Sequence, residues 1–234
     1  MRLRSHKPSL LGALPSESGS QAGTTLCMKH LYSPDLRGVI DAVARCIVAH
    51  ADELSELDRA IGDGDHGVNM KRGSEAVLAG LERLSGLPPS ATMRLIGTIL
   101  VTTIGGASGP LFGTFFLHFG NALAILGSGE GVADAFSVAV RAVEARGRSQ
   151  AGEKTMLDVL VPVEQALRDH RGKPDLLSRL HRVAGEAADD TKAMAASKGR
   201  AAYLGARSIG HMDPGARSSC LIIETACRTL EECC

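Results

Sequence analysis

Apolar residues at helical spacing dominate the chain from Ser33 onward, and this periodicity restricts the fold more than any other feature. In the first such stretch, residues 33–58, apolar side chains recur every three or four positions from Leu36 to Val48 and form one face. Ser33 followed by Pro34 is a typical helix start, because serine caps the first amides and proline fits the first turn.

The same spacing recurs in seven further segments, separated by short glycine- or proline-rich breaks. The expected helices cover residues 33–58, 68–84, 91–104, 111–126, 131–147, 156–171, 174–196 and 220–234. None of these segments alternates with the period of a strand, and no strand–helix–strand order appears, which argues against a Rossmann sheet. We therefore predict an all-α fold in which eight helices pack antiparallel, up and down.

Four polar breaks between these helices carry most of the residues capable of chemistry. They are "GDGDHG" (62–67), "GGASGP" (105–110), "RSQAGEKT" (148–155) and "HMDPGARSS" (211–219). They are the first, third, fifth and seventh connections, and every second connection of an up-and-down bundle lies at the same end. We therefore expect all four segments to meet at one end of the molecule.

Composition argues against several classes of protein. The 26 basic and 26 acidic residues cancel, and no basic stripe interleaved with aromatic residues is present, so we expect no nucleic-acid partner. No apolar run reaches the ~20 residues of a membrane span, so we expect no membrane role. The six cysteines form no C-x-x-C pair, which argues against a zinc or redox motif. Free thiols and a cytoplasmic location are expected.

The first 27 residues differ from the rest of the chain. They begin with basic residues and contain the apolar stretch "LLGAL", which proline, serine and glycine follow at once. That stretch is shorter than the roughly 7–15 apolar residues of a signal peptide. We predict a disordered extension over 1–27 and a single domain over 28–234.

Three aspartates, Asp58, Asp63 and Asp65, fall within eight residues around the first polar break. Clustered carboxylates repel one another unless a cation or protons neutralise them, and hard oxygen ligands suit Mg²⁺ or Ca²⁺. A calcium loop starting at Asp63 would need glycine and glutamate where Val68 and Ser74 stand, so an EF-hand is excluded. The pattern favours Mg²⁺ with substrate phosphates, and an Asx-rich turn that merely caps two helices remains the alternative.

The segment "GGASGP" could bind phosphate, because Ser108 and unpaired main-chain amides stand at the start of a helix. Its glycines could equally serve close helix packing. Pro110 stands where the nucleophile elbow G-x-S-x-G needs its second glycine, which excludes a serine hydrolase of that type. His66 could cap a helix, contact a nucleotide or act as a base, and the pattern leaves these alternatives open.

The segment "GRSQAGEKT" is similar to a P-loop, but Glu153 separates Gly152 from Lys154 and the preceding segment is helical. Lys154 could still supply charge to a phosphate. Arg200 and Arg207 could be phosphate partners or solvated charges on a helix surface. These residues together indicate a helical bundle whose end loops bind Mg²⁺ and a phosphorylated ligand, most simply a nucleotide.

Four motifs in order resemble one known family. "LDRAIGDGDHGVNMKRG", "GGASGPLFGTFF", "GEKTMLDVL" and "GRAAYLGARSIGHMDPGARSS" look like the nucleotide-binding L subunit of dihydroxyacetone kinase, from about Leu31 to the C-terminus. The resemblance implies an eight-helix antiparallel barrel. It also implies that Asp58, Asp63 and Asp65 bind two Mg²⁺ ions that bridge the phosphates of ADP or ATP.

By the same resemblance, a further set of residues would form the nucleotide pocket. These are His66, Gly67, Val68, Asn69, Ala107, Ser108, Gly147, Met156, Arg200, Asp213, Pro214 and Gly215. No residue is assigned a catalytic role beyond the metal–nucleotide site. The family implies a separate K subunit that holds dihydroxyacetone, and an M subunit whose phosphohistidine recharges the bound ADP in the phosphotransferase-system form.

Two other functions remain open. The chain could belong to an ATP-dependent kinase that acts on a related ketose, such as a tetrulose. It could also be a nucleotide-bound regulator that docks on a transcription factor. We favour the phosphotransferase-system form, because no part of the sequence resembles a K domain.

Overall fold

The structure, a computed structural model, describes residues 35–127 and 131–232, so the extension predicted over 1–27 lies outside the described residues. Within these two ranges every regular element is a helix, which confirms the all-α class. The elements are α2 (Asp35–Ala49), α3 (Ala51–Ile61), α4 (His66–Ala79), α5 (Leu81–Leu84), α6 (Pro89–Thr103), α7 (Ser108–Leu126), α8 (Val132–Gly147), α9 (Leu157–Asp169), α10 (Leu176–Asp190), α11 (Pro214–Glu232) and two 3-10 helices, η2 (Thr191–Ala193) and η3 (Arg200–Ser208).

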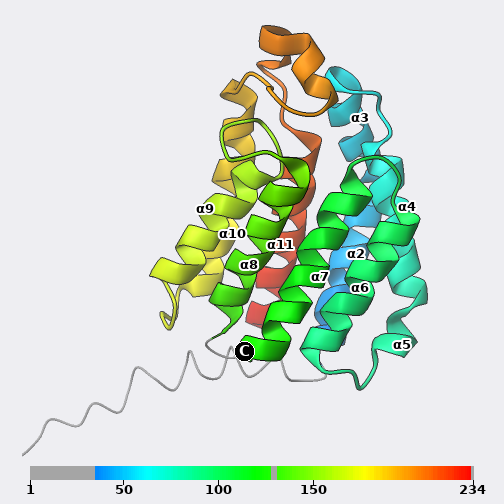
Figure 1. Cartoon of the computed structure of the whole chain (residues 1–234), viewed down its shortest axis with the longest axis vertical. Helices are drawn as coiled ribbons and strands as arrows, with labels where there is room; N and C mark the ends of the chain where they lie inside the picture. The colour runs from blue at the N-terminus through cyan, green and yellow to red at the C-terminus, as the bar shows by residue number, and fades with distance from the viewer. Residues whose placement is uncertain (1–34, 128–130, 233–234) are drawn as a thin grey trace, which may run out of the picture.

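Eight of the helices form a closed ring (Figure 1). Going round it, α2 packs on α4, α4 on α6, and each later helix on the next, until α11 returns to α2. Helices α3 and η3 lie beyond one end of this ring, above the barrel in Figure 1. The predicted antiparallel barrel is therefore confirmed, and its closure leaves no helix of the ring with an open flank.

Several helix boundaries differ from those expected. The first expected helix, 33–58, divides at His50 into α2 and α3. The second, 68–84, begins earlier, at His66, and gives way at Gly80 to the short α5. These differences arise because apolar spacing continues across a bend that keeps the same face inward, so periodicity alone does not reveal the bend.

The largest difference lies between the last two long helices. The seventh expected helix, 174–196, ends as α10 at Asp190, and the last begins as α11 at Pro214. The chain between them contains η2 and the unexpected η3. The start of α11 has a local cause: the Asp213 carboxylate accepts a hydrogen bond from the Ala216 amide at 2.7 Å, and proline fits the first turn.

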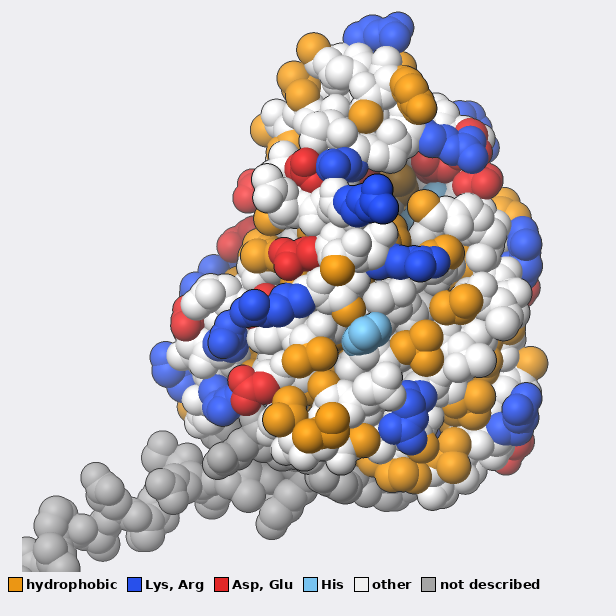
Figure 2. Space-filling view, viewed as in Figure 1, with side chains coloured by type: hydrophobic (Ala, Val, Ile, Leu, Met, Phe, Trp, Pro, Cys, Tyr) orange, Lys and Arg blue, Asp and Glu red, His pale blue; other side chains and the backbone are white. Residues whose placement is uncertain are grey.

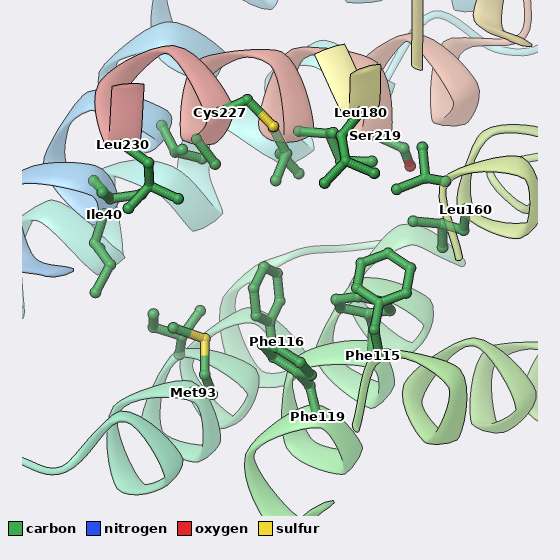
Figure 3. Close-up of a pocket in the computed structure, with 18 of the residues that line it drawn as sticks. Ile40, Met93, Phe115, Phe116, Phe119, Leu160, Leu180, Ser219, Cys227 and Leu230 are labelled. Atoms are coloured by element: carbon green, nitrogen blue, oxygen red, sulfur yellow. The ribbon is translucent and has the colours of Figure 1, made fainter. Parts of the chain in front are cut away.

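The barrel is hollow. An apolar cavity of about 490 Å³ lies among the helices, and Figure 3 shows Ile40, Met93, Phe115, Leu160 and Leu180 directed toward it from five different helices. Phe115 also packs against three other phenylalanines on α7 and α8, with ring centroids 5.1–5.9 Å apart. Four of the five phenylalanines are thus gathered on one wall of the barrel, and aliphatic residues form most of the remaining core.

Helix α7 has the length and apolar composition of a membrane span. Among the helices of residues 35–127 and 131–232, it alone has both properties. It packs between α6 and α8 in the barrel wall. A core helix of a soluble protein has the same properties, so α7 gives no argument for a membrane.

Candidate functional site

A cleft of about 450 Å³ opens at the end of the barrel that carries α3 and η3. All four polar breaks contribute residues to its lining, which confirms the prediction that they meet at one end. Figure 2 shows acidic and basic side chains gathered around the hollow between η3 and α3. The cleft therefore combines both signs of charge within a small volume.

Asp58, Asp63 and Asp65 lie together on one side of this cleft. Asp58 is on the last turn of α3 and the other two are in the loop before α4; one oxygen of each lies within 4.8 Å of the others. Two glycines allow this turn: a Cβ on Gly62 would collide with the Asp58 carboxylate, and Gly64 has a φ of 77°. The glycines in this turn thus let the three carboxylates lie close enough to share a bound cation.

Electrostatics favour a cation among these carboxylates. Burial raises the pKa of Asp58, the charges of Asp63 and Asp65 raise it further, and a hydrogen bond from the His66 amide at 3.1 Å partly offsets both effects. Three oxygen ligands at this spacing, without a soft ligand, suit Mg²⁺. The donor set therefore fits the metal that the family resemblance implies.

Arg200, at the start of η3, forms an ion pair with Asp63 across the cleft. The arginine side chain is 62% exposed, so the pair adds little to stability. Its position matters more, because a guanidinium beside the carboxylates can also bind phosphate oxygens.

Three helices begin at the cleft: α4 at His66, α7 at Ser108 and α11 at Pro214. Each is long enough to have a substantial dipole. The first amides of α11 are bound by Asp213, so an anion would be bound by the amides at the starts of α4 and α7. The His66 ring is buried, and burial lowers its pKa to about 4, so the imidazole is neutral. The cleft thus offers amides for phosphate and carboxylates for metal.

Most of the predicted nucleotide-pocket residues line this cleft: His66, Ala107, Ser108, Gly147, Met156, Arg200, Asp213, Pro214 and Gly215. Three do not. Gly67 packs on α3, where a Cβ would collide with the Ala51 carbonyl, and Val68 is 57% exposed. Asn69 is buried and accepts a hydrogen bond from Arg72 at 3.1 Å. Their contact with a nucleotide stays a prediction.

Comparison with known proteins identifies the family. A sequence profile of the DAK2 domain matches residues 60–228. The chain is 41% identical to the ADP-binding subunit DhaL of PEP-dependent dihydroxyacetone kinase 1 from Listeria innocua, over 75% of this chain and 86% of that protein. It is 40% identical to the corresponding subunit from Escherichia coli, over 77% of this chain and 90% of that one.

The chain belongs to the DAK2 domain family. Among solved structures it is similar to the dihydroxyacetone kinase of C. freundii in complex with AMP-PNP and Mg²⁺, with a TM-score of 0.68 and 23% identity. That match covers 94% of this chain but 38% of the kinase chain, and at this identity it supports the fold alone. The two subunits at 40–41% identity belong to dihydroxyacetone kinases, which are phosphotransferases.

Lys154 of this DAK2 domain has a role that the sequence did not indicate. Its side chain is 1% exposed, and the ammonium donates to the carbonyls of Thr191, Met194, Ser208 and His211 at 2.6–3.0 Å. With every proton used in this way, Lys154 has none for a phosphate. It instead ties the chain between α10 and α11, which carries Arg200, to the barrel.

Two buried aspartates surround this lysine. Asp158 accepts hydrogen bonds from the amides of Gly152 and Thr155 and so shapes the loop before α9. Burial and, less strongly, the Asp158 charge raise the pKa of Asp213 to about 7, against the opposing effects of the Ala216 amide and Lys154. Arg207, the other candidate phosphate partner, is exposed and lies outside the cleft lining.

Replacement of the lysine tests its anchoring role. We expect Lys154→Met to lower the free energy of unfolding by about 3 kcal/mol or more, because two buried and two partly buried carbonyls lose their donor. Lys198→Met is the matched control: Lys198 donates to one carbonyl, that of Arg148, and is partly exposed, so the loss should stay below about 1 kcal/mol. Urea denaturation measures both, and equal losses would contradict the role.

Asp213 should make stability depend on pH. The unfolded chain releases this proton above about pH 4, whereas the folded chain keeps it to about pH 7, so its contribution falls as pH rises through that window. Asp213→Asn keeps the acceptor for Ala216 and removes the titration. We expect the stability of the variant relative to wild type to rise by about 2–4 kcal/mol between pH 4 and pH 8.

Urea denaturation across this pH range measures the difference. The exposed Asp175, at the start of α10, supplies the control variant Asp175→Asn, which should follow the wild-type curve. A difference between Asp213→Asn and wild type that does not change with pH would contradict the buried, protonated state of Asp213.

Proposed function

We propose that this chain is the ADP/ATP-binding subunit of a phosphoenolpyruvate-linked dihydroxyacetone kinase. It would transfer a phosphoryl group, by way of Mg²⁺-bound nucleotide, to dihydroxyacetone held on a separate K subunit. The observation that carries the proposal is the cleft itself, whose lining combines three carboxylates with the N-termini of α4 and α7. This arrangement suits the metal and the phosphates of one ligand at once.

Each group in the cleft has a proposed task. Asp58, Asp63 and Asp65 would hold two Mg²⁺ ions, which neutralise charge on the phosphate oxygens. The amides at the starts of α4 and α7 would bind phosphate oxygens, and Arg200 would exchange its pairing with Asp63 for a phosphate. Phosphoryl transfer needs mainly positioning and charge neutralisation, so we assign no general base.

The phosphoryl donor would be a phosphohistidine on an M subunit, and ADP would stay bound as a cofactor. The relatives at 40–41% identity are named PEP-dependent, which supports this form. We place the reaction in the cytoplasm. Docking on a transcriptional regulator would be a further role of the nucleotide-bound protein.

A second candidate is an ATP-dependent ketose kinase. The L-erythrulose 1-kinase of Mycolicibacterium smegmatis is 33% identical over 91% of this chain, which spans 40% of that protein. In that case nucleotide would exchange freely, and the same three aspartates would hold the metal.

Substitution of one aspartate tests the metal site. We expect Asp63→Asn to weaken Mg²⁺-dependent ADP binding at least about tenfold, or about 1.4 kcal/mol, because a ligand is lost. Stability without Mg²⁺ should not fall, since one repulsive charge is removed. Isothermal titration with and without Mg²⁺ measures the affinity. The control is Asp52→Asn, an exposed aspartate on the same helix α3; equal affinity in both variants would refute the site.

The nucleotide content of the purified protein separates the two kinases. After extensive desalting, the protein is denatured and the supernatant is run on an ion-exchange column. We expect near-stoichiometric ADP, because a retained cofactor does not exchange with solvent. Protein that elutes empty and then binds ATP reversibly would support the ATP-dependent kinase instead.

A further inference from the structure

A chain of side-chain hydrogen bonds runs from the cleft into the barrel wall. The His66 ring on α4 lies between two serines: its Nδ1 is 3.0 Å from the Ser108 hydroxyl on α7, and its Nε2 is 2.7 Å from the Ser218 hydroxyl on α11. Ser218 is fully buried and His66 is 7% exposed. The chain therefore joins the three helices whose first turns face the cleft.

The direction of each hydrogen bond follows from the number of protons. The Ser218 hydroxyl lies 3.0 Å from the Pro214 carbonyl, which can only accept, and a hydroxyl that directs its single proton there accepts from His66. The Pro214 carbonyl, which also interacts with the His66 ring, accepts as well. In this arrangement Nε2 carries the ring proton, which points at two acceptors, and Nδ1 accepts the proton of Ser108.

The direction of these hydrogen bonds determines whether the Ser108 hydroxyl can donate to a ligand or only accept from it. Its proton is directed inward to His66, so its oxygen presents only lone pairs to the cleft. Such an oxygen can accept a hydrogen bond or bind a cation, but it cannot donate to a phosphate oxygen. The imidazole in turn has no free nitrogen with which to act as a base or to contact phosphate.

We propose that Ser218 and the His66 ring are positioning residues that hold the Ser108 hydroxyl as an acceptor at the metal–nucleotide site. The proposal deepens the function proposed above and rests on it for the ligand. Within this scheme the phosphate contact at the start of α7 comes from main-chain amides. The imidazole acts only through Ser108.

The tautomer is tested first, in nucleotide-free protein. Nitrogen NMR of ¹⁵N-histidine-labelled protein, with the His66 signals assigned by their loss in His66→Gln, should show the proton on Nε2. A proton on Nδ1 would overturn the proposal, because Ser108 would then be free to donate to phosphate. This readout does not depend on nucleotide binding, so it stays informative if the proposed function fails.

A double-mutant cycle tests the action through Ser108. We expect Ser218→Ala to weaken Mg²⁺–ADP binding about three- to tenfold, as the loss of one oriented hydrogen bond would, and to have no added effect in a Ser108→Ala background. Ser219→Ala is the matched control, because Ser219 is equally buried on the same helix and donates to the Gly215 carbonyl at 2.9 Å. Additive losses, or equal losses in Ser218→Ala and Ser219→Ala, would overturn the proposal.

Discussion

The repulsion among Asp58, Asp63 and Asp65 is the constraint on which the rest of the cleft depends. Their oxygens lie within 4.8 Å of one another because the chain turns tightly between α3 and α4 through two glycines. Such a turn is unfavourable for three anions unless positive charge is supplied. The Arg200 ion pair supplies part of it, and the first amides of α4 add a dipole of the right sign.

A second cation orders the chain between α10 and α11. The buried Lys154 ammonium donates hydrogen bonds to four carbonyls of this one connecting segment. It therefore fixes the conformation of the main chain there, much as a bound metal ion would. The segment that it anchors carries Arg200 to the carboxylates. The structure therefore uses one lysine to place an arginine, and that arginine partly balances the aspartates.

Apolar periodicity and the alternation of connections predicted the helical class, the antiparallel packing and the meeting of the polar loops, because both follow from local order. The closed barrel was implied only by the resemblance to a known family. The sequence did not predict the bend at His50, because the apolar face continues across it. Nor did it reveal η3 or the role of Lys154, whose partners lie 37–57 residues away. The Ser218–His66 contact spans 152 residues and has no local signature.

The central claim is that the three aspartates bind divalent metal together with nucleotide. A crystal structure of the protein with ADP and Mn²⁺, with data collected at the manganese absorption edge, tests it most directly. The account predicts anomalous peaks beside Asp58, Asp63 and Asp65, at the ~2 Å expected for carboxylate ligands, with the ADP phosphates on the far side of the metal. Bound ADP without a peak there, or a peak elsewhere, would contradict it.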